Sequence, residues 1–140
     1  MRTLHKIISV FFLLLLICLF SACSEGVPVL TGEWVEVLSD ADMQLTAVIE
    51  ENTVEVYWVS EESESRNLYW AGSFVPPEEE GTYTWVSDNN VDKTSKSVFA
   101  SGEGSKSFCY NKGLLSFDVT AFGETRTVSM ERVELESDTE

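Results

Sequence analysis

Two neighbouring stretches decide the fold of this chain: Met43-Gln44-Leu45-Thr46-Ala47-Val48-Ile49 and Thr53-Val54-Glu55-Val56-Tyr57-Trp58-Val59-Ser60. In both, apolar side chains stand at every second position, which is typical of a β-strand with one buried face. Glu51-Asn52 lies between the stretches and predicts a turn. We therefore expect the two strands to pair antiparallel.

The rest of the chain continues this pattern, and no window shows a capped helical period of 3.6 residues. Further strands are predicted over 34–38, 67–75, 82–87, 97–101, 106–110, 114–122 and 125–134. Gly102-Glu103-Gly104 should join 97–101 and 106–110 in a hairpin, and the polar run 88–96 should form a loop with room for a helical turn. Because most connections are short, neighbouring strands should pair as a meander.

Eight or nine short strands predict an all-β domain. We favour a closed up-and-down barrel over a Greek-key sandwich, because closure removes exposed sheet edges. Within 67–75, one face should carry Leu68, Trp70, Gly72 and Phe74. Aromatic side chains are expected to point inward at Trp58, Trp70, Tyr83, Trp85, Phe108, Tyr110 and Phe117. They would fill the core, line a cavity for a small ligand or form a patch for a protein partner; the packed core is favoured, since eight strands enclose little space.

The beginning of the chain has the pattern of a secretory signal. Arg2 and Lys6 precede an unbroken apolar run from Ile7 to Phe20, and small residues follow in Ser21-Ala22-Cys23. The apolar run is shorter than the roughly 20 residues of a membrane-spanning helix. We therefore expect export and cleavage. A cut before Cys23 is favoured, and a cut after Ser24 by the general signal peptidase is the alternative.

The run from Leu19 to Cys23 resembles the lipobox of bacterial lipoproteins, with Phe20 at a position where that motif usually has Leu. The resemblance implies that the Cys23 thiol carries a lipid and holds the protein at the extracytoplasmic face of the cell membrane. Two or three acyl chains would give stable anchoring. The expected organisation is a signal peptide over 1–22, the lipid-bearing Cys23 and a linker over 23–30, the barrel over 31–135 and an acidic tail over 136–140.

Gly32-Glu33-Trp34 resembles the G-x-W motif on the first strand of calycins, the superfamily of lipocalins, fatty-acid-binding proteins and avidins. The resemblance implies that Trp34 plugs one end of the barrel under an arginine of the last strand, Arg132 or, as the weaker candidate, Arg126. The run from Leu68 to Gly72 is similar to a strand of small, uncharacterised lipoproteins of Gram-positive bacteria, and implies no activity. The candidate ligand or core aromatics are Trp34, Trp58, Trp70, Tyr83 and Trp85.

Composition excludes several classes of function. The chain carries a formal charge of −15, which argues against nucleic acid as a partner. Its single histidine, His5, lies in the signal, so the domain lacks histidine-based catalysis and histidine-containing metal sites. Cys109 is expected to be a buried, inert thiol.

No catalytic, cofactor or metal site is expected. Asp88-Asn89-Asn90-Val91-Asp92 departs from a calcium-binding EF-hand loop at two later positions, Lys93 and Phe99.

The sequence favours a non-enzymatic, membrane-tethered module that binds a small apolar ligand or a protein partner. The alternative is an acidic inhibitor or immunity-type protein directed against a cationic enzyme or toxin. A hydrolase that uses carboxylates is the weakest of the three hypotheses, because nothing singles out a pair among the 24 acidic residues.

Overall fold

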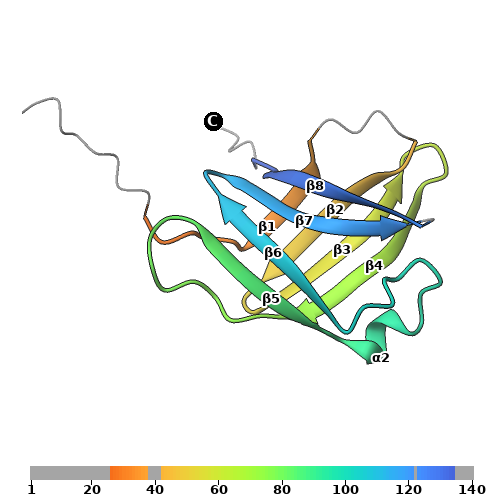
Figure 1. Ribbon diagram of the computed structural model, residues 1–140. Helices are drawn as coiled ribbons and strands as arrows, with labels where there is room; N and C mark the ends of the chain where they lie inside the picture. Colours follow the sequence, from red (N-terminus) through yellow and green to blue (C-terminus); the bar gives the residue numbers. More distant parts are fainter. Residues whose placement is uncertain (1–25, 38–41, 122, 135–140) are drawn as a thin grey trace, which may run out of the picture.

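The computed structural model describes residues 26–37, 42–121 and 123–134 (Figure 1). They form a closed antiparallel barrel of eight strands in sequence order. The strands are β1 (Gly32–Glu36), β2 (Gln44–Glu50), β3 (Thr53–Ser60), β4 (Ser65–Ser73), β5 (Tyr83–Asn89), β6 (Ser105–Asn111), β7 (Leu114–Ala121) and β8 (Glu124–Arg132). One short helix, α2 (Val91–Thr94), follows β5. The predicted all-β class and the closed meander are confirmed; the predicted signal, Cys23 and the tail lie outside the described residues.

Each strand pairs with its neighbour in sequence, and β1 pairs with β8 to close the barrel, with Trp34 opposite Arg132. The β2–β3 hairpin has the expected register, because Ile49 faces Val54 and Ala47 faces Val56 across the turn. All four of these side chains are fully buried. Alternation in the sequence therefore places one face of this hairpin in the core.

A β-bulge in β4 changes which residues face inward. Val56 of β3 pairs with Trp70, but the next residue, Tyr57, pairs with Leu68, so Tyr69 is the extra residue of β4. A bulge of this kind shifts the alternation of the strand by one position. Tyr69 and Trp70 are consequently both buried, whereas Leu68 is only half-buried. The expectation that Leu68 shares the inner face of Trp70 is therefore wrong.

The seam between β4 and β5 is short. Only Gly72 and Ser73 pair with β5, opposite Asn89 and Asp88. The segment 90–104, which contains α2, lies along the rest of the β4 edge. The backbone N–H groups of Asn90 and Ser101 donate to the carbonyl oxygens of Ala71 and Tyr69 at 2.8 Å each, and the Ser97 hydroxyl donates to that of Leu68 at 2.6 Å.

The predicted strand over 97–101 is therefore wrong. Its intended partner, β6, is already paired with β5 on one side and β7 on the other, with Ser105 opposite Asp88. The segment instead satisfies the backbone carbonyls that β5 leaves free on β4, as buried polar groups require. The helical turn expected within 88–96 is present as α2, whereas Asp88 and Asn89 belong to β5.

The interior is packed with aromatic rings. Trp85 stacks on Phe108 with ring centroids 5.4 Å apart, and Phe108 meets Phe117 at 4.9 Å. Of the aromatic residues expected to point inward, Trp70, Trp85, Phe108 and Phe117 belong to the buried core, and Trp58, Tyr83 and Tyr110 pack against it. Such pairs add to the stabilisation from burial. Most of the barrel interior is therefore filled.

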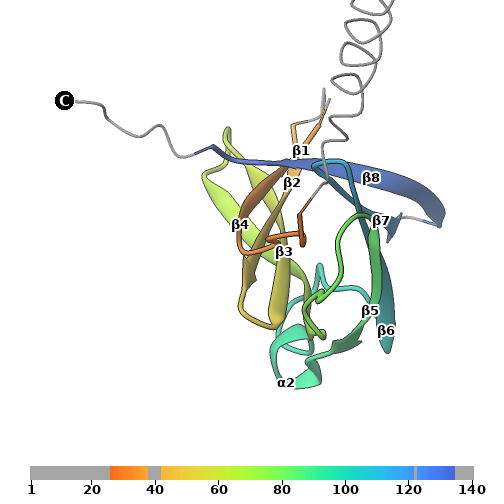
Figure 2. The ribbon, with the colours of Figure 1, turned by 90° about the vertical axis from the view of Figure 1, so that its left-hand side faces the viewer.

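One end of the barrel is closed by the chain ahead of β1. Figure 2 shows this segment between β3–β4 on one side and β5–β6 on the other. Leu30 is buried there, and its carbonyl accepts a hydrogen bond of 2.9 Å from the Trp34 indole nitrogen. Arg132 lies 4.9 Å over the Trp34 ring and donates to the carbonyls of Val29 and Thr31. The structure thus places Arg132 over the indole, whereas Arg126 binds Glu36.

Candidate ligand-binding site at the open end of the barrel

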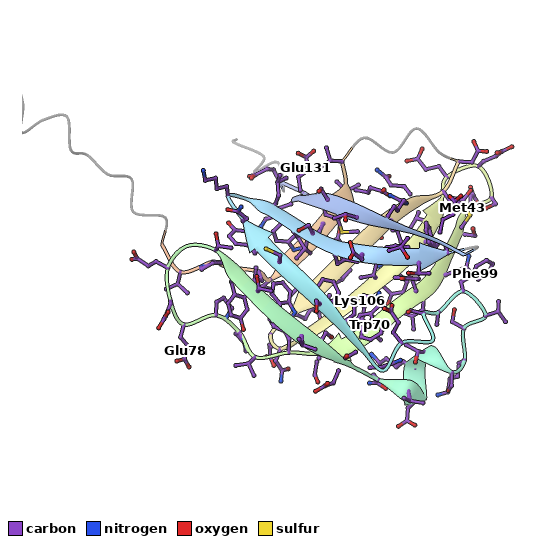
Figure 3. The ribbon with its side chains drawn as sticks, in the orientation of Figure 1. Met43, Trp70, Glu78, Phe99, Lys106 and Glu131 are labelled. Atoms are coloured by element: carbon purple, nitrogen blue, oxygen red, sulfur yellow. The ribbon has the colours of Figure 1, made fainter. Side chains whose placement is uncertain are left out.

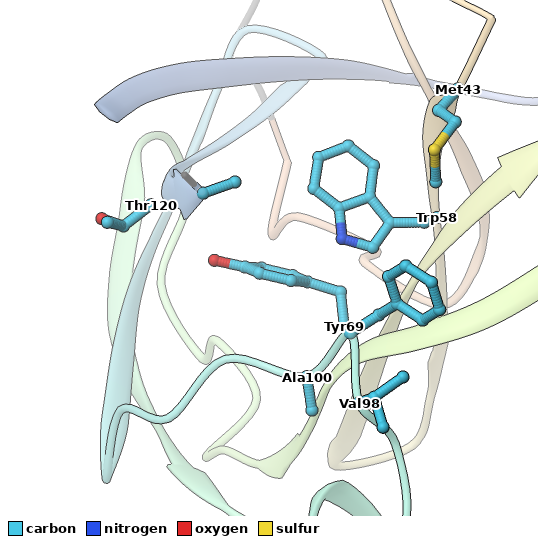
Figure 4. Close-up of a pocket in the computed structure, with 8 residues that line it drawn as sticks. Met43, Trp58, Tyr69, Val98, Ala100 and Thr120 are labelled. Atoms are coloured by element: carbon cyan, nitrogen blue, oxygen red, sulfur yellow. The ribbon is translucent and has the colours of Figure 1, made fainter. Parts of the chain in front are cut away.

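A cavity of about 340 Å³ lies at the end of the barrel opposite Trp34 (Figure 4). It is lined by Met43, Trp58, Tyr69, Val98, Phe99, Ala100, Thr120 and Ala121. Figure 3 shows Met43 and Phe99 at this end and Glu78 at the other. The walls thus come from the ends of β3 and β7, the chain just before β2, the bulged part of β4 and the segment 90–104. We call the end of the barrel that holds this cavity the open end.

Two aromatic rings form the inner wall of the cavity. Trp58, two residues before the end of β3, and Tyr69, at the bulge of β4, meet edge to face with centroids 5.7 Å apart and planes at 74° (Figure 4). The bulge is what turns Tyr69 inward at this level. Phe99 adds a third ring from the segment 90–104 and is 46% exposed. The outer wall is therefore partly open to solvent.

The hydroxyl of Tyr69 is buried and has no hydrogen-bond partner. Tyr69 is 2% exposed, and its oxygen is one of three such atoms in the described part of the chain, with Thr46 Oγ1 and Trp85 Nε1. Of these three residues, Tyr69 alone lines the cavity. A buried hydroxyl without a partner is costly to the folded state. A ligand that bonds to the Tyr69 oxygen would remove that cost.

A buried lysine lies behind the cavity wall. The Lys106 ammonium nitrogen is 5.3 Å from the ring centroid of Tyr69 and 5.5 Å from that of Trp70. It forms an ion pair with Glu103 and donates to the carbonyl oxygen of Asp118 at 2.9 Å. The charge of Lys106 is thus matched by a neighbouring carboxylate and is held within the wall.

The Glu103 carboxyl shows the strength of this pairing. Burial raises its pKa, but hydrogen bonds from Lys106 and Ser101 outweigh burial, so the pKa lies below its usual value. The Ser101 hydroxyl donates at 2.6 Å, and the Glu103 carbonyl accepts from the Asn89 side chain at 2.7 Å. This network fixes the segment 90–104, and with it Phe99, against the barrel.

A second polar cluster lies on the outside, between β3 and α2. Glu55 pairs with Lys93 and accepts a hydrogen bond from Tyr57, whose ring lies 4.0 Å from the Arg66 guanidinium. Burial raises the pKa of Glu55, yet the hydrogen bonds from Lys93 and Tyr57 lower it overall. Burial and the bond to Glu55 raise the pKa of Tyr57. The polar groups of this cluster bind one another, so we assign the cluster a structural role in holding α2 against β3.

The aromatic residues singled out from the sequence separate in the structure. Trp34, Trp70 and Trp85 are buried in the core, and Tyr83 packs against it away from the cavity. Only Trp58 of this set lines the cavity.

Sequence reasoning missed Tyr69, Met43 and Phe99 as lining residues. The one signal was the pair of adjacent aromatics in Leu68-Tyr69-Trp70, because a regular strand would send one ring outward.

Cys109 is half-buried rather than buried, because it stands between the inward-facing Phe108 and Tyr110 on β6. No cluster of three or more His, Cys, Asp and Glu side chains suited to a metal ion occurs among residues 26–37, 42–121 and 123–134. In the same part of the chain, no helix has the length and apolar character needed to cross a membrane. Comparisons with protein-family models, with curated proteins and with solved structures found no match to the chain.

Proposed function

We propose that this protein is a membrane-tethered binding module whose open-end cavity holds a small, mainly apolar ligand with one hydrogen-bonding group. The observation that carries the proposal is the cavity lined by Trp58, Tyr69 and Phe99; the Tyr69 hydroxyl, at the end of one of these lining side chains, is buried and unpaired. Ligand sites are typically apolar hollows with a few placed polar groups that fix orientation. This cavity has that composition.

The volume of the cavity limits the ligand. About 340 Å³ lies at the small end of the usual range of ligand pockets, and the core below it is closed by packed rings. A long acyl chain that needs the full depth of a barrel does not fit this geometry. We therefore infer a compact ligand that enters from the open end and stops at Trp58 and Tyr69.

The tether is the second part of the proposal. Its support is the signal pattern ahead of Cys23 and the lipobox-like run from Leu19. In the proposed arrangement the barrel presents the cavity at the outer face of the cell membrane. No catalytic role is proposed, because the described lining residues hold no pair of groups suited to acid–base or nucleophilic chemistry.

The proposal is tested by filling the cavity. Ala100 lines the cavity, so Ala100→Trp should occupy it, whereas Val75 is 73% exposed and lies in the loop after β4, outside the cavity. Both variants of the full chain add one indole, which keeps the optical background equal. Calorimetric titration with 2-naphthol should show binding to the wild type and to Val75→Trp, and loss of binding in Ala100→Trp. Equal binding by all three proteins would place the site elsewhere and refute the proposal.

A further inference from the structure

We propose that the cavity selects an organic cation with an apolar body, such as a quaternary or tertiary ammonium compound. This inference rests on the proposed function, because it names the chemical class of ligand for the same cavity. It combines the aromatic walls, the absence of a free positive charge among the described lining residues and the acidic loops around the open end.

The aromatic walls suit a cation. Trp58 and Tyr69 present two rings at 74° to each other, and Phe99 adds a third ring. A cation held within about 6 Å of a ring centroid is attracted by the electron-rich face, and rings at steep angles allow contact with more than one face. Methyl groups on the nitrogen would also bury apolar surface against Met43 and Ala121, which line the same cavity.

None of the eight lining residues carries a charge. The nearby cation of Lys106 is 3% exposed and is already bound by Glu103 and by the Asp118 carbonyl. It therefore neither offers an anchor for an anionic ligand nor places an unmatched positive charge in the cavity.

Acidic residues surround the open end. The turn between β3 and β4 begins three residues after Trp58 and carries the exposed Glu61, Glu62 and Glu64. Asp42, just before Met43, and Glu124, at the start of β8, are also exposed at this end. Negative charges around an apolar hollow attract cations and repel anions. The cavity and its aromatic walls turn this acidic rim into a candidate site.

The decisive experiment compares two ligands that differ in charge alone. Benzyltrimethylammonium and neopentylbenzene have the same shape, with a quaternary nitrogen in one and a quaternary carbon in the other. Calorimetric titration of the full chain should show the cation binding at least about tenfold more tightly, the advantage expected from cation–π contact in a partly desolvated site. If the neutral compound binds equally well or better, the cation inference is overturned while the proposed binding function stands. If neither compound nor 2-naphthol binds, both proposals fail.

Phe99→Leu tests the role of the rings. Phe99 is partly exposed and belongs to a loop, so the substitution should leave the fold intact. Leucine keeps apolar contact but removes the aromatic face, so affinity for the cation should fall several-fold, while affinity for neopentylbenzene should change little. An equal loss for the two ligands would show that Phe99 contributes apolar contact only and would argue against cation selection.

The rim is tested with two matched triple variants. Glu61, Glu62 and Glu64 are changed to glutamine in one variant, and Glu78, Glu79 and Glu80 in the other. Both remove three exposed charges, but the second group lies away from the open end (Figure 3). The first variant should weaken cation binding at low salt, and the difference from wild type should shrink at high salt. Equal weakening by both variants would mean that only net charge matters and that the rim forms no part of the site.

Discussion

At Gly72 the contact between β4 and β5 leaves no space for a side chain. A Cβ atom at this position would lie 2.2 Å from Ser87 Oγ, 2.5 Å from the carbonyl oxygen of Asp88 and 2.9 Å from the indole nitrogen of Trp70. The Ser87 hydroxyl and the Trp70 indole are themselves hydrogen-bonded at 3.1 Å. Since one of the obstructing atoms belongs to the backbone, a side chain here must displace the short β4–β5 seam.

We expect Gly72→Ala to lower the free energy of unfolding by roughly 3 kcal/mol, the upper part of the usual range for overpacking. Urea unfolding followed by tryptophan fluorescence measures the change. Gly104→Ala is the control, because a Cβ at Gly104 meets nothing within 4 Å. Its stability should stay close to wild type or rise slightly. A Gly72→Ala variant as stable as Gly104→Ala would show that the seam yields easily.

Individual residues also differ in whether their inward or outward orientation could be predicted from the sequence. The inward positions of β2 and β3 could be read from alternation, because both strands are regular and Leu45, Ala47 and Val54 keep their period. Tyr69 could not be assigned, since a bulge depends on what the partner strand needs and leaves no fixed residue pattern. The place of the Tyr69 ring in the cavity wall could therefore be found only from the structure.

Among the elements, the segment 26–31 closes one end of the barrel, and the Arg132 side chain holds this segment in place. Arg132 joins the carbonyl groups of Val29 and Thr31 to the face of Trp34. Gly32, with φ +137°, lies below the guanidinium, where a Cβ would come within 3.3 Å of Nη1. A lysine cannot reproduce both the fork of donors and the stacking.

Arg132→Lys should therefore destabilise the domain by about 1–3 kcal/mol, the usual cost of losing hydrogen bonds to a charged group. Amide hydrogen exchange within 26–31 should rise more than exchange in the β2–β3 hairpin. Arg126→Lys is the matched control, because Arg126 pairs with Glu36, whereas the side-chain hydrogen bonds to the carbonyls of Val29 and Thr31 come from Arg132. If both variants raise exchange in 26–31 equally, the closure does not depend on Arg132.

The segment 90–104 is the element that the sequence pattern misassigned. Ser97-Val98-Phe99-Ala100-Ser101 has the length and composition of a strand, but Val98 is 94% exposed and the backbone bonds to the edge of β4 instead. Strand formation requires an available partner as well as a suitable sequence. Of the predicted eight or nine strands, this is the one that does not form, and the barrel has eight.

The pairing of Glu103 with Lys106 predicts how this segment responds to acid. Because the pKa of the Glu103 carboxyl is lower in the folded protein than in the unfolded chain, its contribution is present above the unfolded value and is lost as the pH falls through the folded value. Glu103→Gln should be less stable than wild type at pH 7, and the difference should shrink as the pH falls below about 4. Unfolding curves between pH 3 and pH 7 measure this.

Glu78→Gln serves as the control for the acid response, because Glu78 forms none of the ion pairs of the described residues. Its stability should follow that of wild type across the range. Some acid sensitivity should remain in Glu103→Gln, since the pKa of Glu55 is also lowered by its partners. A constant difference between Glu103→Gln and wild type at every pH would contradict the assigned pairing.

For the whole molecule, the closed meander could be predicted from the number of strands and the short connections, and a packed core was favoured because eight strands enclose little space, whereas the cavity at one end could not be predicted. The packed core and the cavity both depend on the volumes of rings such as Trp85 and Phe108 in the closed sheet. Trp34 and Arg132 were placed together through the resemblance to calycins and do lie in contact.

The proposed tether makes a prediction at this scale. Cys23→Ala should move the protein from the membrane fraction to the soluble fraction, because the acyl chains would have no thiol to attach to. Cys109→Ala is the matched control, since it removes a half-buried thiol of β6 and leaves the signal unchanged. Immunoblots of fractionated cells measure both. A Cys23→Ala protein that stays with the membranes would refute the tether.

The position of the closure gives the tethered molecule a direction. Gly26, where the described chain begins, leads into the closed end, and the cavity lies at the opposite end. Cys23 is three residues before Gly26, a reach of at most roughly 11 Å. In the tethered molecule, then, the entrance would face away from the lipid, and the ligand would arrive by diffusion from the surrounding fluid. Uptake would follow the concentration outside the cell and would be indifferent to the composition of the bilayer.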